Sequence, residues 1–209
     1  MKFVLQTALV SLAMISLGGG LYYGADLLLR SPIPIITGDK IAYQKLAKEA
    51  TDPFLRSGKK PINNGYRQNN FYLKAIKDRP SARSCLQKPE RNSKDPDLRK
   101  IDWVAMQSEH EIRVCLFRIF QSLGTPEKVV KWYESTGFQS VKTETYEGGG
   151  QQITRVVAAN PVRRNGFVFH PATGFASRIA MRGKWSETSQ AVWDEQMNLF
   201  STSFDTTVH

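Results

Sequence analysis

The chain has 209 residues, which is the length of one ordinary domain with a short appendage. Apolar residues make up 41% of it and charged residues 23%, a composition that argues against wholesale disorder and low-complexity filaments. Two cysteines are too few for a disulfide-rich scaffold, and no cysteine and histidine spacing is typical of a zinc module, whereas the formal net charge of +10 calls for an explanation.

The N-terminal segment predicts a transmembrane anchor over residues 1–30. Residues 3–25 are 23 residues without a charged side chain. As a helix this stretch would be about 34 Å long, enough to cross about 30 Å of hydrocarbon. Tyr22 and Tyr23 lie at its far end, where aromatic rings favour the membrane interface. A lipid bilayer is therefore the first expected partner.

A cleaved signal peptide is the alternative interpretation of this segment. Cleavage near Gly18–Gly20 would give a secreted protein that begins near Leu21. The new N-terminus would carry a further apolar stretch in need of burial, so we favour a retained signal-anchor. Charges flank the segment on both sides, with Lys2 before it and Arg30 after it. We expect a single-pass protein whose body is periplasmic or extracellular.

Small residues recur at four-residue spacing within the predicted anchor. Ser16, Gly20 and Gly24 match a small-xxx-small pattern, which allows two membrane helices to approach closely. The pattern allows a homodimer through the membrane helix as a hypothesis. The favoured interpretation is that glycine is simply common in membrane spans.

Residues 31–100 are expected to hold a spacer, a short helix and a basic irregular segment. Prolines after Arg30 favour an extended spacer, and Asp39 can cap a helix over 40–50. Residues 54–100 carry 13 basic and 4 acidic side chains, a charge of +9, whereas 101–209 carry 11 of each. Apart from a short ordered element over 71–76, the block has little periodic pattern, and 78–100 is predicted to be irregular or mobile.

The basic block is the candidate binding surface. Its cations are interleaved with the aromatic residues Tyr66, Phe71 and Tyr72. The expected anionic-surface contacts are Lys59, Lys60, Arg67, Lys74, Lys77, Arg79 and Arg83. In a tethered domain the nearest anionic target is a phospholipid surface or an envelope component, and nucleic acid is the less favoured partner. The alternative is a solvated loop with no partner.

Residues 101–209 predict a compact α+β domain that starts with two helices. Ser108 can accept from the third helical amide while Glu111 reaches back, and an apolar face then runs from Ile112 to Leu123. Gly124 can end this helix. Thr125, followed by proline and glutamate, starts a second helix that runs towards Gly137.

The remaining sequence predicts a four-stranded antiparallel meander and a final helix. Strands are expected over 141–146, 153–159, 167–169 and 175–181, with turns at Gly148–Gly150 and Asn165–Gly166. Ser186 can cap a C-terminal helix whose apolar side includes Trp193 and Phe200. The predicted fold is α+β, with helices packed on one sheet face.

Candidate chemistry is sparse in this sequence. Cys85 and Cys115 can form a disulfide if the body is exported, and closing this loop would stabilise the fold by about 3–4 kcal/mol. The alternatives for Cys115 are an inert core thiol or a nucleophile that pairs with His170. We expect no cofactor or metal. The favoured function is binding or assembly, and the alternative is an exported, hydrolase-like enzyme whose site forms only in the fold.

Overall fold

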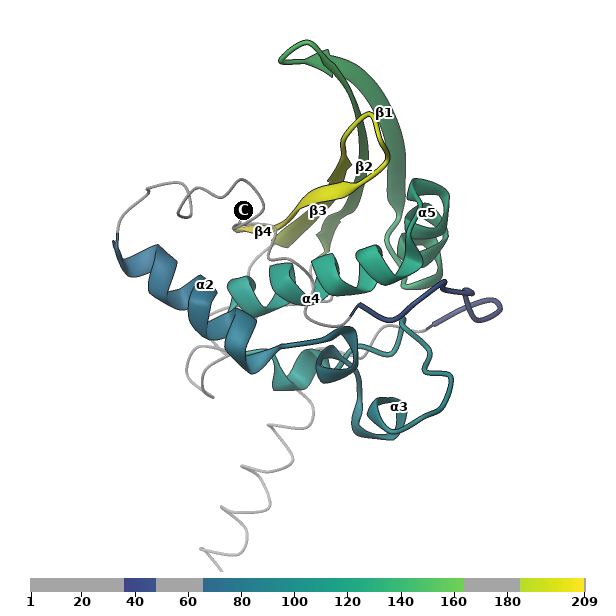
Figure 1. Cartoon of the computed structure of the whole chain (residues 1–209), viewed down its shortest axis with the longest axis vertical. Coiled ribbons are helices and arrows are strands. Elements are labelled where there is room, and N and C mark those ends of the chain that lie inside the picture. Colours follow the sequence, from purple (N-terminus) through teal and green to yellow (C-terminus); the bar gives the residue numbers. More distant parts are fainter. Residues whose placement is uncertain (1–35, 48–65, 164–184, 209) are drawn as a thin grey trace, which may run out of the picture.

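The computed structural model describes residues 36–47, 66–163 and 185–208. Its fold is α+β, with several helices beside a four-stranded antiparallel sheet, as the sequence predicts (Figure 1). The longer elements are α2 (Tyr66–Asp78), α4 (Glu109–Leu123), α5 (Pro126–Ser135), β1 (Ser140–Gly148), β2 (Gln151–Arg163), β3 (Trp185–Trp193) and β4 (Leu199–Val208). Two 3-10 turns, η1 (Ala82–Cys85) and η2 (Trp103–Ala105), and the short helix α3 (Lys88–Arg91) lie between α2 and α4.

Helices α4 and α5 form where the local signals predict them. Ser108 Oγ accepts from the Glu111 amide at 3.2 Å, and Gly124 ends α4 with a φ of +86°. Thr125 caps α5, with Pro126 in its first turn. One detail differs from the expectation, because the Glu111 carboxylate accepts from Arg79 and not from the cap.

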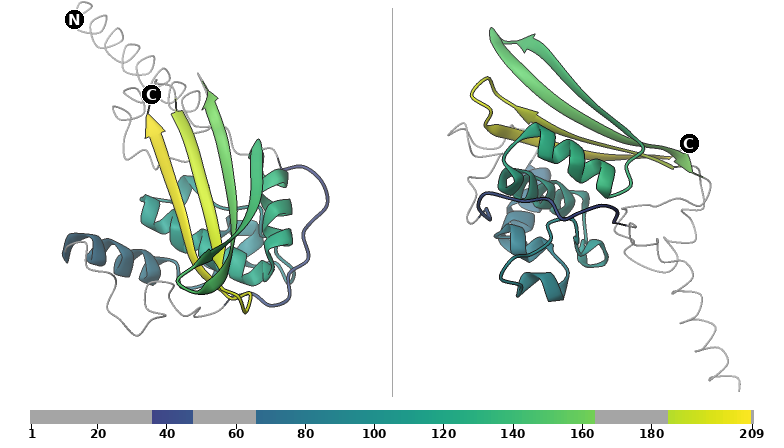
Figure 2. Two further views of the ribbon diagram at one scale, coloured as in Figure 1. Left: turned by 90° about the horizontal axis from the view of Figure 1, so that it is seen from above. Right: turned by 90° about the vertical axis from the view of Figure 1, so that its right-hand side faces the viewer.

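The sheet has the strand order β1-β2-β3-β4, and every neighbouring pair is antiparallel. Strands β1 and β2 confirm the predicted strands over 141–146 and 153–159. They meet at Gly149 and Gly150, whose φ values of +63° and +77° are those of a type I′ turn. Alternate side chains such as Val156 and Phe204 are buried, and α4 and α5 cover that face (Figure 2).

The predicted C-terminal helix is wrong, because residues 186–200 form most of β3 and the turn into β4. The inward positions of β3 begin with polar residues, which hides the period of two. Glu187 is buried and accepts from Asn160 Nδ2 at 3.1 Å, and buried Ser189 shares a 2.7 Å hydrogen bond with Tyr133. The predicted strands over 167–169 and 175–181 lie outside the described residues.

The predicted helix over 40–50 is not formed in its described part, since residues 40–47 have no helical backbone. Long-range hydrogen bonds hold this segment instead. The Ala47 amide donates to Ser122 Oγ at 2.9 Å, and the Ala47 carbonyl accepts from the Ala82 amide. Thr37 N donates to the Ser135 carbonyl at the end of α5. Tertiary partners therefore replace the bonds that a helix would make.

The expected anchor over residues 1–30, with Ser16, Gly20 and Gly24, lies outside the described residues. Within the described ranges, none of the helices has the length and apolar character needed to cross a membrane.

Candidate anionic-surface site on helix α2

The predicted disulfide between Cys85 and Cys115 is present. It joins η1 to α4, and both residues are buried in the core. The bond ties the segment after α2 to the longest described helix. It also occupies the Cys115 sulfur, so Cys115 is not a free thiol nucleophile while the disulfide is intact.

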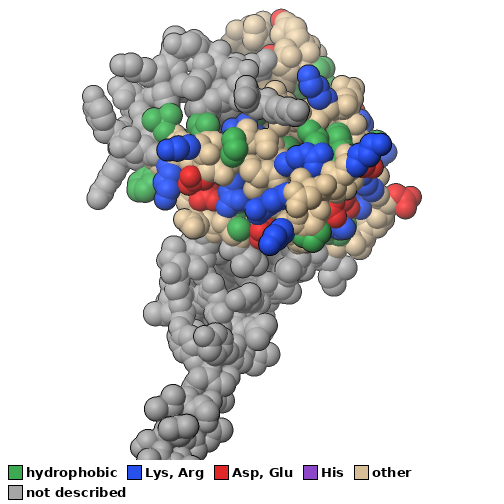
Figure 3. Space-filling view, turned by 60° about the horizontal axis from the view of Figure 1, so that its bottom comes forward, with side chains coloured by type: hydrophobic (Ala, Val, Ile, Leu, Met, Phe, Trp, Pro, Cys, Tyr) green, Lys and Arg blue, Asp and Glu red, His purple; other side chains and the backbone are tan. Residues whose placement is uncertain are grey.

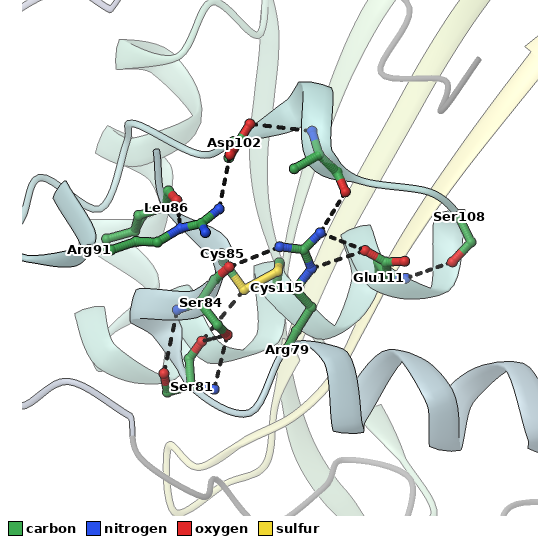
Figure 4. Close-up of polar contacts among 11 residues, drawn as sticks. Arg79, Ser81, Ser84, Cys85, Leu86, Arg91, Asp102, Ser108, Glu111 and Cys115 are labelled. Atoms are coloured by element: carbon green, nitrogen blue, oxygen red, sulfur yellow. Dashed lines mark hydrogen bonds and ion pairs between the residues drawn. A yellow bond between two sulfur atoms is a disulfide. The ribbon is translucent and has the colours of Figure 1, made fainter. Parts of the chain in front are cut away.

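Arg79 fixes the end of α2 against α4 (Figure 4). Its Nε and Nη2 donate to Glu111 Oε2 at 3.0 and 2.8 Å, and the side chains of both residues are largely buried. Nη1 donates to the Ser84 carbonyl at 2.9 Å, and Nη2 also donates to the Ala105 carbonyl at 2.6 Å. The guanidinium therefore joins α2, η1, η2 and α4 from the inside.

Other arginines of the basic block also form hydrogen bonds that hold the irregular segment between α2 and α4. Arg83 Nη1 donates to the carbonyls of Arg91 and Ser93 at 2.8 and 2.6 Å. Arg99 makes a buried, bidentate pair with Asp97, with bonds of 2.9 and 2.8 Å. A guanidinium has five donors, so one side chain can satisfy several carbonyls that no regular ladder reaches. Much of the block's charge is therefore structural.

The inner side of α2 packs on α4 through aromatic rings. The Tyr72 ring meets His110 edge-on with 4.2 Å between centroids, and the Phe71 ring stacks on His110 at 5.9 Å. Arg113 Nη1 donates to the Tyr72 hydroxyl at 2.9 Å. Burial, and then the positive charge of Arg113, lower the pKa of His110, so this imidazole favours its neutral form. These contacts set which face of α2 points outward.

The exposed part of α2 combines two lysines with two apolar side chains: Leu73 lies beside the lysines on the side away from α4, and Phe71 lies at the edge, where it also stacks on His110. Lys74 and Lys77 are exposed, and neither makes an ion pair with another described residue. Phe71 and Leu73 are 52% and 49% exposed, a large fraction for such residues. At the end of the molecule where α2 lies, Figure 3 shows hydrophobic and basic side chains next to one another. We call Phe71, Leu73, Lys74 and Lys77 the α2 surface.

The structure thus divides the predicted contact residues. It brings Lys74 and Lys77 together on one exposed face and turns the donors of Arg79 and Arg83 inward. Arg67 belongs to α2, but its side chain is not described, and Lys59 and Lys60 lie outside the described residues. Leu73 was not among the predicted contact residues. Its signal is its position about 200° around the helix from Ala75, which α2 buries, so that Leu73 points away from the core.

A second surface feature is an open groove of about 540 Å³ between residues 37–42 and α5. Lys40, Lys128 and Lys131 line it together with Asp39 and Glu134, so its charges are mixed. In the part of the chain that the structure describes, no three histidine, cysteine or acidic side chains gather where they could hold a metal ion. The α2 surface is therefore the better candidate for a binding function.

Comparisons of the chain with protein-family models, with curated proteins and with solved structures find no match.

Proposed function

We propose that this is a membrane-anchored protein with a binding or assembly role, and that its α2 surface contacts anionic phospholipid. The observation that carries the proposal is that Leu73, Lys74 and Lys77 share one exposed face of α2, and that Phe71, half exposed at the edge of this face, adds apolar area to it. Helices that lie in a bilayer interface present this combination, because apolar side chains enter the acyl boundary while lysines reach the headgroups. The proposed partner is the bilayer to which residues 1–30 would anchor the chain.

The rigid seating of α2 supports this proposal. Arg79 and the aromatic contacts to His110 hold one side of the helix on α4, so the opposite side is presented without a further ordering cost. The disulfide favours an oxidising compartment, which agrees with a periplasmic or extracellular body. A retained anchor would keep the α2 surface at high effective concentration near lipid.

A dye that responds to polarity can test the contact in the full-length protein. The variant Leu73→Cys offers a single free thiol to the dye, because both native cysteines are in the disulfide. The labelled full-length protein is then reconstituted into nanodiscs. We expect a blue-shifted emission in discs with anionic lipid and a smaller shift in neutral discs or at high salt. A dye on Gln151→Cys, at the exposed tip of the β1–β2 hairpin, is the positional control.

Charge reversal supplies the matched comparison. K74E/K77E should abolish the difference between anionic and neutral discs, since it removes both cations of the α2 surface. K88E/K94E changes the net charge equally at two other exposed lysines of the same basic block and should keep the difference. Equal emission in both kinds of disc, or equal loss from the two double variants, would refute the proposal. Binding of the full chain to a purified anionic envelope polymer, with no lipid response, would assign the surface to that partner instead.

A further inference from the structure

Among the strands that the structure describes, β1 is an edge of the sheet and pairs with β2 alone (Figures 1 and 2). Residues 142–147 of β1 are all exposed. A long exposed edge presents unpaired amides and carbonyls, which are a template for another strand. Lys142 and Glu144 are its central charged residues. Both lie on the sheet face opposite to α4 and α5, because their partners in β2 alternate with the buried residues Val156 and Ala158.

The hairpin determines which backbone groups of β1 are free. Gly148 and Gln151 close a two-residue turn and therefore form a hydrogen-bonded pair. Because such pairs alternate along an antiparallel ladder, the even-numbered residues of β1 bond to β2. The odd-numbered residues from Val141 to Glu147 point their amides and carbonyls away from the sheet. No hydrogen bond joins these outward groups to another described residue.

We propose that two copies of the chain pair through β1, antiparallel and centred on Thr143. In this register Thr143 faces Thr143 of the second copy, and the outward backbone groups of both strands meet in hydrogen-bonded pairs. Lys142 then lies opposite Glu144 of the second copy, and Glu144 lies opposite Lys142. The two four-stranded sheets become one continuous sheet.

Charge selects this register over its neighbours. A shift of two residues in one direction places Lys142 opposite Lys142, and a shift in the other direction places Glu144 opposite Glu144. Like charges directly opposite one another destabilise a strand pair, whereas opposite charges stabilise it. A shift of one residue would match outward backbone groups with groups already bonded to β2. The sequence of β1 is therefore self-complementary in one register only.

The charges on this face are also placed to extend an existing pair. Glu144 already accepts from Arg155 of β2, with 3.2 Å between Nε and Oε2. Lys142 has no ion-pair partner among the described residues. Pairing would place Lys142 of one copy beside the Arg155–Glu144 pair of the other. Edge pairing buries little area, so we expect a dissociation constant in the micromolar range.

Charge-swapped variants of the full-length protein in detergent test the pairing. K142E and E144K should each weaken self-association about tenfold, because each turns two attractive pairs into repulsive ones. An equimolar mixture of K142E with E144K should associate again, since every acidic residue then faces a lysine. Analytical ultracentrifugation measures all three samples. A dimer through the membrane helix would not respond to these changes, so a dimer whose affinity is the same in all samples overturns the proposal. A wild-type protein that is monomeric at 100 μM also overturns it, because a micromolar dissociation constant predicts a dimer at about this concentration.

Cysteine crosslinking tests the register separately. In the proposed pairing residues 142 and 144 are a non-hydrogen-bonded pair with about 4.5 Å between Cα atoms, within reach of a disulfide. Two copies of residue 142 would be about 8 Å apart, which is too far. Oxidation of mixed K142C and E144C should therefore give a covalent dimer, and either variant alone should give little. Equal crosslinking in all three samples overturns the register.

Discussion

Replacement of Arg79 by methionine is expected to destabilise the protein by about 3–5 kcal/mol, because it leaves a buried carboxylate without its cation. The Glu111 side chain is 6% exposed and receives two hydrogen bonds from Arg79. The same substitution removes the donors to the carbonyls of Ser84 and Ala105. These losses fall at the junction of α2, η1, η2 and α4, so no single element can relax alone.

The double variant R79M/E111L separates the charge from the packing. It removes the uncompensated carboxylate and leaves only the two carbonyls without donors. Its free energy of unfolding should therefore fall by less than that of R79M, by about 1–3 kcal/mol. Urea unfolding of the oxidised protein, followed by tryptophan fluorescence, gives both free energies. If R79M loses less than about 1 kcal/mol, water or another cation compensates Glu111, and the assigned role of Arg79 is refuted.

Three further perturbations test the disulfide, His110 and the Arg99–Asp97 pair. The variant C85A/C115A should lose about 3–4 kcal/mol in urea unfolding, because the disulfide closes a loop with a sequence separation of 30 in the unfolded chain; an unchanged stability would contradict that reasoning. Burial and the charge of Arg113 lower the pKa of His110, so the unfolded chain binds its proton more readily than the folded one, and this residue's contribution to stability must fall as the pH drops through the imidazole's ordinary range. H110F should therefore flatten the dependence of unfolding free energy on pH between about pH 7.5 and pH 5.5. Parallel pH profiles for H110F and the wild type would contradict this role of His110. R99K should lower the free energy of unfolding by about 2 kcal/mol, because one ammonium cannot replace a bidentate guanidinium beside Asp97. Equal stability of R99K and the wild type would show that the positive charge alone suffices at this position.

The helices α4 and α5 could be predicted because their signals are local. A cap at Ser108 or Thr125 acts on an amide three residues away, and Gly124 supplies a positive φ within the same turn. The β1–β2 hairpin is local in the same sense, since its turn lies between two alternating runs. Structure that depends on residues only a few positions apart can therefore be predicted from a single sequence.

Strand β3 was not predictable by the same route, because its inward residues are satisfied by distant partners. Glu187 is bonded to Asn160, and Ser189 to Tyr133. Without those partners the pattern looks polar first and apolar later, which resembles the entry of a capped helix. The long-range bonds of Ala47 likewise replaced the helix expected there.

The candidate site was predictable in part. The charge of residues 54–100 indicated the segment that contains the α2 surface, but it could not separate cations that point outward from those that hold the backbone together. Residue chemistry offers the distinction in retrospect. Arg79, Arg83 and Arg99 bond inward to carbonyls and carboxylates, whereas Lys74 and Lys77 remain exposed. In an irregular segment with few apolar residues, an arginine is the side chain best able to satisfy stray carbonyls.

Because these arginines bond inward, the α2 surface alone has only a limited affinity for lipid. Each lysine near an anionic bilayer contributes about 1 kcal/mol, so Lys74 and Lys77 together give about a thirtyfold preference for anionic over neutral lipid. Such a preference does not hold a protein on a membrane from free solution, and one weak attachment requires a second. It is enough to orient a domain that is already tethered beside the bilayer. The proposed anchor and the α2 surface therefore depend on each other: without the anchor, the exposed Phe71 and Leu73 would have to supply most of the binding free energy.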